Sequence, residues 1–161
     1  MKYIFDIDGT LADCSHRLHF IEPADNATFT YDGKLEFNPD WESFYRDCVN
    51  DKPIAPTVEL LRALQEYGAN IIYITGRPCK YMNETIQWLK KYTECPVRCL
   101  YMRTNNDHRP DYIVKKEIYE TQIKPNLKNE TIWGVFEDRK QCVDMWRSLG
   151  LTCFQVADGN Y

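Results

Sequence analysis

Two aspartates, Asp6 and Asp8, stand one residue apart in the stretch FDIDGT, directly after an apolar run and before a Gly-Thr turn. Two carboxylates this close repel each other unless something positive is bound between them. Carboxylate oxygens are the ligands that a hard dication such as Mg²⁺ prefers. The pair therefore indicates a metal-assisted site, and the plainer alternative is a solvated strand end.

Groups of matching chemistry recur further along the chain. They are Thr75, Gly76 and Arg77 in TGR, then Arg103, then Lys115, and finally Glu137, Asp138 and Arg139 in EDR. Asp138 could share a Mg²⁺ ion with Asp6 and Asp8. A phosphate on that metal would meet Thr75, Lys115 and the free backbone N–H groups of the turn after Asp8. Asp111 lies four residues before Lys115, on the same face of one helix.

An alternation of strands and helices has to bring these residues together. The expected strands are 2–5, 70–78, 97–102, 131–139 and 152–157, and the expected helices are 11–20, 40–49, 57–67, 83–92, 109–123 and 140–150. This order is typical of an α/β fold, a Rossmann-like parallel sheet with helices on both faces. Ligands of such sheets bind beyond the carboxyl ends of the strands, and the polar motifs follow those ends.

Residues 21–55 are the one insertion into this plan, and we expect a small cap or flap over the site. Within it, 27–37 alternates around Asp32-Gly33, a strong signal for a hairpin. A hairpin this short cannot bury both faces, so its aromatic residues are candidates for stacking on a base. They are Phe29, Tyr31 and Phe37.

A second aromatic group follows the hairpin. Trp41, Phe44 and Tyr45 occur at helical spacing, which favours core packing over a base-stacking platform.

Composition bounds the class of protein. The 161 residues suit a single domain, 1–161, and no apolar stretch approaches the ~20 residues that span a bilayer, so no membrane partner is expected. A net charge of −4 argues against an extended grip on nucleic-acid phosphates. The seven cysteines are odd in number and form no CxxC, which indicates reduced thiols of a cytoplasmic protein.

The motifs DIDGT, TGR, Lys115 and EDR, in this order, resemble the haloacid dehalogenase (HAD) superfamily. The resemblance implies a Mg²⁺-dependent phosphomonoesterase. It implies that Asp6 attacks phosphorus and forms an aspartyl-phosphate. It also implies that Asp8 protonates the leaving oxygen and later activates water.

Longer stretches, DIDGTLADCSHR and MRTNNDHRPDYIVKKEIYE among them, resemble the phosphatase domain of phage polynucleotide kinase-phosphatase. That family removes 3′-phosphates from nucleic-acid ends, so the resemblance implies such ends or nucleotides as substrate. Its motif positions fall on Asp6, Asp8, Arg17, Thr75, Arg77, Arg103, Asp111, Lys115 and Asp138. Arginine forks suit phosphate oxygens, so the three arginines are expected to bind phosphate.

The chain also departs from that pattern. Glu137 stands where the family often has Asp, and we expect it to support the metal site. No GxxxxGK[ST] loop occurs, so a kinase or ligase would be a separate partner. If the chain is phage-encoded, its location is the host cytoplasm.

Two other functions remain open at this point. The acidic balance favours a small-molecule nucleotidase acting on nucleoside monophosphates, and an inactive phosphate-binding adaptor is the second alternative. The sequence leaves open DNA versus RNA, base preference and oligomeric state, a homo-oligomer included.

Overall fold

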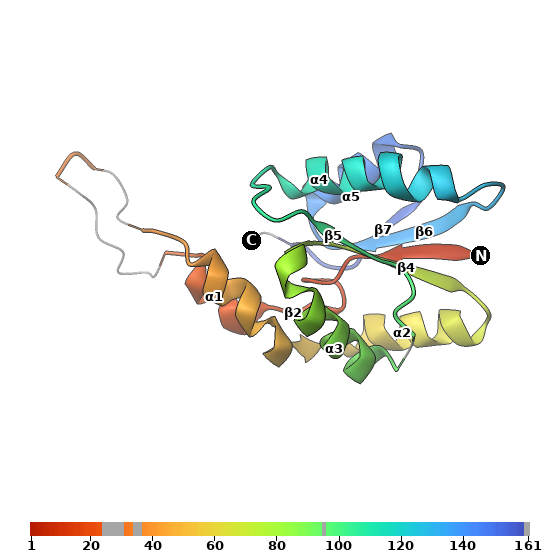
Figure 1. Cartoon of the computed structure of the whole chain (residues 1–161), viewed down its shortest axis with the longest axis horizontal. Coiled ribbons are helices and arrows are strands. Elements are labelled where there is room, and N and C mark those ends of the chain that lie inside the picture. The colour runs from red at the N-terminus through yellow and green to blue at the C-terminus, as the bar shows by residue number, and fades with distance from the viewer. Residues whose placement is uncertain (24–30, 34–36, 95, 160–161) are drawn as a thin grey trace.

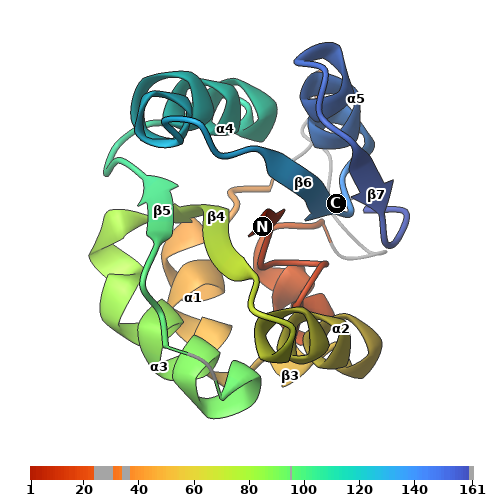
Figure 2. The same cartoon turned by 90° about the vertical axis from the view of Figure 1, so that its right-hand side faces the viewer.

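The computed structural model describes residues 1–23, 31–33, 37–94 and 96–159. Its centre is a five-stranded parallel sheet in the order β5-β4-β1-β6-β7 (Figures 1 and 2). The strands are β1 (Lys2–Phe5), β4 (Asn70–Pro78), β5 (Leu100–Arg103), β6 (Ile132–Glu137) and β7 (Cys153–Gln155). The predicted α/β parallel sheet is confirmed. Because β1 lies between β4 and β6, Asp6 and Asp8 emerge at the middle of the carboxyl edge.

Helices cover both faces of the sheet (Figure 2). On one face lie α2 (Ala55–Glu66) and α3 (Met82–Thr93), and on the other α4 (Asp111–Ile118) and α5 (Lys140–Ser148). Successive strand residues point to opposite faces, so each strand contributes to two cores. Ile4 packs with α4 and α5, whereas Phe5 packs with α2 and α3. Near-continuous apolar strands are what a sheet buried on both faces requires.

The segment 11–20, expected as a helix, is different. Gly9 has a φ of 79° and reverses the chain, so that Leu11 N and Ala12 N both donate to Ile7 O at 2.8 Å. Ala12–Asp13 then forms strand β2, antiparallel to β3 (Lys52–Pro53). Only Ser15–Phe20 is helical, and it is a 3-10 helix, η1. The pairing with β3 takes the backbone groups that a longer helix would need.

The helix expected over 109–123 begins at Asp111. Its α-helical part, α4, ends at Ile118, and a π-helical turn, η4 (Tyr119–Ile123), and a 3-10 turn, η5 (Lys124–Asn126), continue it.

The insertion contributes one α-helix among the described residues. It is α1 (Trp41–Arg46), begun by Asp40, whose side chain accepts from Ser43 N at 3.0 Å, and followed by the 3-10 turn η2 (Asp47–Asn50). Most of the predicted hairpin 27–37, Phe29 included, lies outside the described residues; Gly33 has the positive φ expected of its turn, 78°. Across the ranges described, no helix combines the length and apolarity needed to cross a membrane.

Candidate active site

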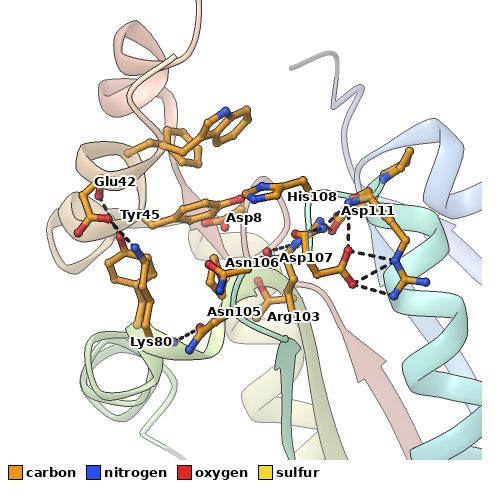
Figure 3. A pocket seen from close by; sticks show the side chains of 18 of the residues that line it. Asp8, Glu42, Tyr45, Lys80, Arg103, Asn105, Asn106, Asp107, His108 and Asp111 are labelled. Atoms are coloured by element: carbon orange, nitrogen blue, oxygen red, sulfur yellow. Dashed lines mark hydrogen bonds and ion pairs between the residues drawn. The ribbon is translucent and has the colours of Figure 1, made fainter. Parts of the chain in front are cut away.

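One cavity of about 510 Å³ opens at the carboxyl edge of the sheet (Figure 3). Asp6 and Asp8 after β1, Thr75 and Gly76 on β4, and Arg103 at the end of β5 all line it. Its size falls within the ~300–1,000 Å³ typical of small-ligand sites. The sheet topology therefore brings together residues that lie up to a hundred positions apart in sequence.

Lys115 lies fully buried beneath this cavity. Its Nζ donates to Asp6 Oδ1 at 2.7 Å and to Glu137 Oε2 at 2.8 Å, and lies 3.1 Å from Asp111 Oδ2. Burial lowers the pKa of Lys115, but the charges of Asp111, Asp6 and Glu137 outweigh burial and raise it well above its ordinary value. The ammonium is therefore a fixed positive charge directly beside Asp6.

Asp6, Glu137 and Asp138 form a carboxylate cluster whose ligand oxygens lie within 4.8 Å of one another. Burial, followed by the charge of Glu137, raises the pKa of Asp6 well above its ordinary value. Burial likewise raises the pKa of Glu137 to about 7. A set of hard oxygen donors whose ionisation is opposed by burial and mutual repulsion fits a divalent cation such as Mg²⁺.

Asp8 points to different partners. Arg77 Nε donates to its Oδ2 at 3.0 Å, Arg77 Nη2 donates to its Oδ1 at 2.5 Å, and Arg17 Nη2 also donates to Oδ1. Burial alone would raise the pKa of Asp8, but the charges of Arg17 and Arg77 lower it well below its usual range. Asp8 thus lies outside the carboxylate cluster, whereas Glu137 belongs to it.

The two arginines have no exposed surface. Each also contacts Asp51, which is fully buried: Arg17 Nε donates to Asp51 Oδ1 at 2.7 Å and Arg77 Nη2 donates to Oδ2 at 2.8 Å. Arg17 Nη1 further donates to the backbone oxygen of Phe44 at 3.1 Å. Arg17 and Arg77, expected to bind phosphate, are placed here to hold Asp8. Asp51 was missed by sequence reasoning because an aspartate in a loop before β3 matches no motif.

Arg103 lies at the cavity wall and organises its rim. Its Nη2 donates to Asp111 Oδ1 at 3.0 Å and its Nε donates to Gly76 O at 2.8 Å. Its Nη1 donates to the backbone oxygens of Asp107 and Arg109, at 3.0 and 2.6 Å. One guanidinium therefore ties β4, α4 and the loop 104–110 together.

Gly76 is required by close approach. A Cβ at this position would lie 2.1 Å from Asp111 Oδ1, a distance that no side chain tolerates. Thr75, fully buried before it, accepts a hydrogen bond from Arg77 N at 3.2 Å. The TGR motif therefore combines a hydroxyl at the cavity, a backbone that leaves room for Asp111, and an arginine that holds Asp8.

The sheet order is that of a fold shared with solved phosphatases of the haloacid dehalogenase type, with the two aspartates after β1 and the buried lysine on α4 at its carboxyl edge. Residues 25–161 match the family model described as the polynucleotide kinase PNKP phosphatase domain, and the chain belongs to this family.

Two relatives illustrate the similarity. A viral protein from Autographa californica nuclear polyhedrosis virus, named as a bifunctional polynucleotide kinase/RNA ligase, is 30% identical over 91 residues, 56% of this chain and 13% of its own. A chain of the Pnkp1/Rnl/Hen1 RNA repair complex superposes with a TM-score of 0.73 at 29% identity, covering 99% of this chain and 43% of that one. This chain thus spans less than half of either relative.

The class C acid phosphatase of Bacillus anthracis shares the fold at 14% identity. Its TM-score is 0.64, and the superposition covers 99% of this chain and 68% of that one.

Proposed function

We propose that this chain is a Mg²⁺-dependent phosphomonoesterase that removes 3′-phosphates from polynucleotide ends through an aspartyl-phosphate on Asp6. The observation that carries the proposal is the contact of 2.7 Å between Lys115 Nζ and Asp6 Oδ1 at the base of the cavity. A fixed positive charge there offsets part of the nucleophile's own charge and attracts an incoming phosphate. Thr75 and Gly76 lie on the same cavity wall, where the phosphate oxygens would bind.

In the first half of the reaction, an Asp6 oxygen attacks phosphorus as the bond to the leaving oxygen breaks. Asp8 gives a proton to that oxygen. Arg17 and Arg77 keep Asp8 ionised before substrate binds. The negative phosphate beside it raises its pKa, and Asp8 takes up from the solvent the proton that it then gives to the leaving oxygen. In the second half, Asp8 takes a proton from water, which then hydrolyses the aspartyl-phosphate.

Asp6, Glu137 and Asp138 would hold the Mg²⁺ ion, which when bound neutralises charge on the transferred phosphoryl group. Asp138 is also bordered by backbone: a Cβ at Gly159 would lie 2.1 Å from its Oδ2. The absence of a side chain at Gly159 therefore leaves space for the Asp138 carboxylate.

Family membership supports a polynucleotide substrate, since the viral relative is named for polynucleotide kinase and the other relative belongs to an RNA repair complex. A separate kinase or ligase partner is part of the same proposal. The cavity rim carries the cations Lys80, Arg109 and Arg139, of which Lys80 is paired with Glu42 and Arg109 with Asp107 and Glu117. The six cysteines described are free thiols, which supports a reducing, cytoplasmic location.

A small-molecule nucleotidase is the second candidate. The net charge of −4 and a cavity sized for one small ligand favour it.

A substrate panel tests the two functions. We expect kcat/KM to be highest for 3′-phosphorylated oligonucleotides, DNA and RNA both assayed, and lower for 3′- and 5′-mononucleotides. Higher values for mononucleotides would favour the nucleotidase. Asp6→Asn should abolish turnover, because an amide is a poor nucleophile, and circular dichroism should show an unchanged fold. More than a few per cent of the wild-type rate in the folded variant would rule out the covalent route.

A further inference from the structure

An aromatic wall forms one side of the active-site cavity. Trp41 and Tyr45 come from α1, and Tyr81 from the 3-10 turn η3 (Cys79–Tyr81) that follows β4. The Trp41 and Tyr45 rings stack, with centroids 5.9 Å apart and planes 26° apart, and the Tyr45 and Tyr81 rings lie 5.6 Å apart. The three rings therefore form one continuous aromatic group at the cavity.

Core packing does not account for all of this wall. Phe44, which was expected to pack with its neighbours, does so: it is 4% exposed, and its ring lies 4.1 Å from the Arg17 guanidinium carbon. Trp41 keeps 47% of its surface exposed although it lines a cavity. An indole left open beside an active site is available for a second flat ring. Phe44 thus packs in the interior, whereas Trp41 and Tyr45 of the same helix line the cavity.

The loop 104–110 forms the facing side and carries polar edges (Figure 3). Asn105 Oδ1 accepts from Lys80 N at 2.9 Å, which fixes the loop to the turn η3 beneath the aromatic wall. Asn106 has a left-handed φ of 64°, and its side chain and that of His108 are exposed at the cavity. Among the residues described, neither side chain makes a hydrogen bond. An amide and an imidazole offer the donors and acceptors that a base edge requires.

The same cavity reaches the reacting groups, since Asp6 and Asp8 line its floor. Burial raises the pKa of Tyr45 to about 12, so its hydroxyl stays neutral beside a negative substrate. The cavity therefore combines aromatic rings, polar side chains and a phosphate site. These groups are complementary to the base face, the base edge and the phosphate of a nucleotide.

We propose that this cleft binds the base of the nucleotide that carries the scissile phosphate, stacked on the Trp41–Tyr45 wall with its edge toward Asn106 and His108. The inference rests on the proposed function and names the part of the substrate that the site recognises. In this proposal, α1 and the loop 104–110 make the contacts with the base.

The test compares two oligonucleotides of equal length that end in a 3′-phosphate. In one the terminal nucleotide carries its base, and in the other it is abasic. Stacking on an aromatic side chain contributes ~1–3 kcal/mol per base, so wild-type kcat/KM should favour the base-bearing end by about 5- to 150-fold. Trp41→Leu should reduce this ratio by at least ~5-fold, and Trp41→Phe should restore much of it.

Trp133→Leu is the matched control, because Trp133 on β6 is 58% exposed and does not line the cavity. It should leave the ratio unchanged. Hydrolysis of both oligonucleotides with equal kcat/KM would overturn the base site alone and leave the 3′-phosphatase function standing. A ratio insensitive to both Trp41 variants would also overturn it. Failure to hydrolyse either oligonucleotide would overturn the proposed function and the base site with it.

Discussion

Replacing Asp51 by Asn should destabilise the fold strongly. Asp51 is fully buried, and its Oδ2 accepts from Arg17 Nη2 at 2.9 Å and from Arg77 Nη2 at 2.8 Å. An asparagine would either place its amide nitrogen, a donor, against these two donors or turn it toward Arg17 Nε. It would also leave two buried cations with Asp8 as the remaining carboxylate of this network. Breaking one partner of a buried charge network costs ~3–5 kcal/mol.

That loss is a large fraction of the ~5–15 kcal/mol that holds a typical domain folded. For a chain of this length it should lower the melting temperature by roughly 6–20 °C, measured by circular dichroism and by urea unfolding. Catalysis should fall as well, because Asp51 orients both arginines that hold Asp8.

Asp47→Asn is the control, from the same segment of the chain. The Asp47 side chain is 33% exposed, accepts from Asn50 Nδ2 at 2.6 Å and lies 3.1 Å from His16 Nε2. A partly exposed pair of this kind contributes ~0–1 kcal/mol. If the two variants lose the same free energy of unfolding, the buried network does not carry the stability assigned to it.

Three further outcomes are expected. Gly76→Ala should lower kcat/KM by ~100-fold, because the added carbon displaces the Asp111 side chain. An unchanged value would show that Asp111 can move aside without loss of activity. Calorimetry should show that Asp138→Ala loses Mg²⁺ affinity while Asp8→Asn keeps most of it, and the reverse order would place the metal at Asp8. Without Mg²⁺, Glu137 has a pKa of about 7 when folded and ~4.3 when unfolded, so the folded chain binds more protons between these values. Its free energy of unfolding should therefore fall as pH rises from about 4 to 7, and Glu137→Gln should flatten this slope.

The sheet and the residues at its edge could be predicted because both follow from local patterns. Apolar strands alternate with amphipathic helices, and strand ends carry the polar motifs, so Thr75, Glu137 and Asp138 are found from sequence alone. The segment 11–20 could not be predicted, because its pairing with β3 is a contact between residues about forty positions apart. Base contact by the hairpin stays a prediction, because most of that segment lies outside the described residues. Trp41 and Tyr45 line the cavity, which helical spacing could not predict because it does not show which side of α1 faces it.

Separate cationic partners explain how Asp6 and Asp8, two like charges one residue apart, can both be held at this edge of the sheet. Asp8 belongs to a network of two carboxylates and two arginines, with Asp51 as the other carboxylate, so its charge is matched by groups of the protein itself. Asp6 instead shares the single ammonium of Lys115 with Asp111 and Glu137, and burial raises its pKa. A further cation is therefore favoured beside Asp6 and has no such reason to bind at Asp8. Two aspartates one residue apart thus acquire different environments from partners that only the fold brings to them. The proposed mechanism uses this difference, with Asp6 as the nucleophile beside a metal and Asp8 as the proton carrier held by arginines.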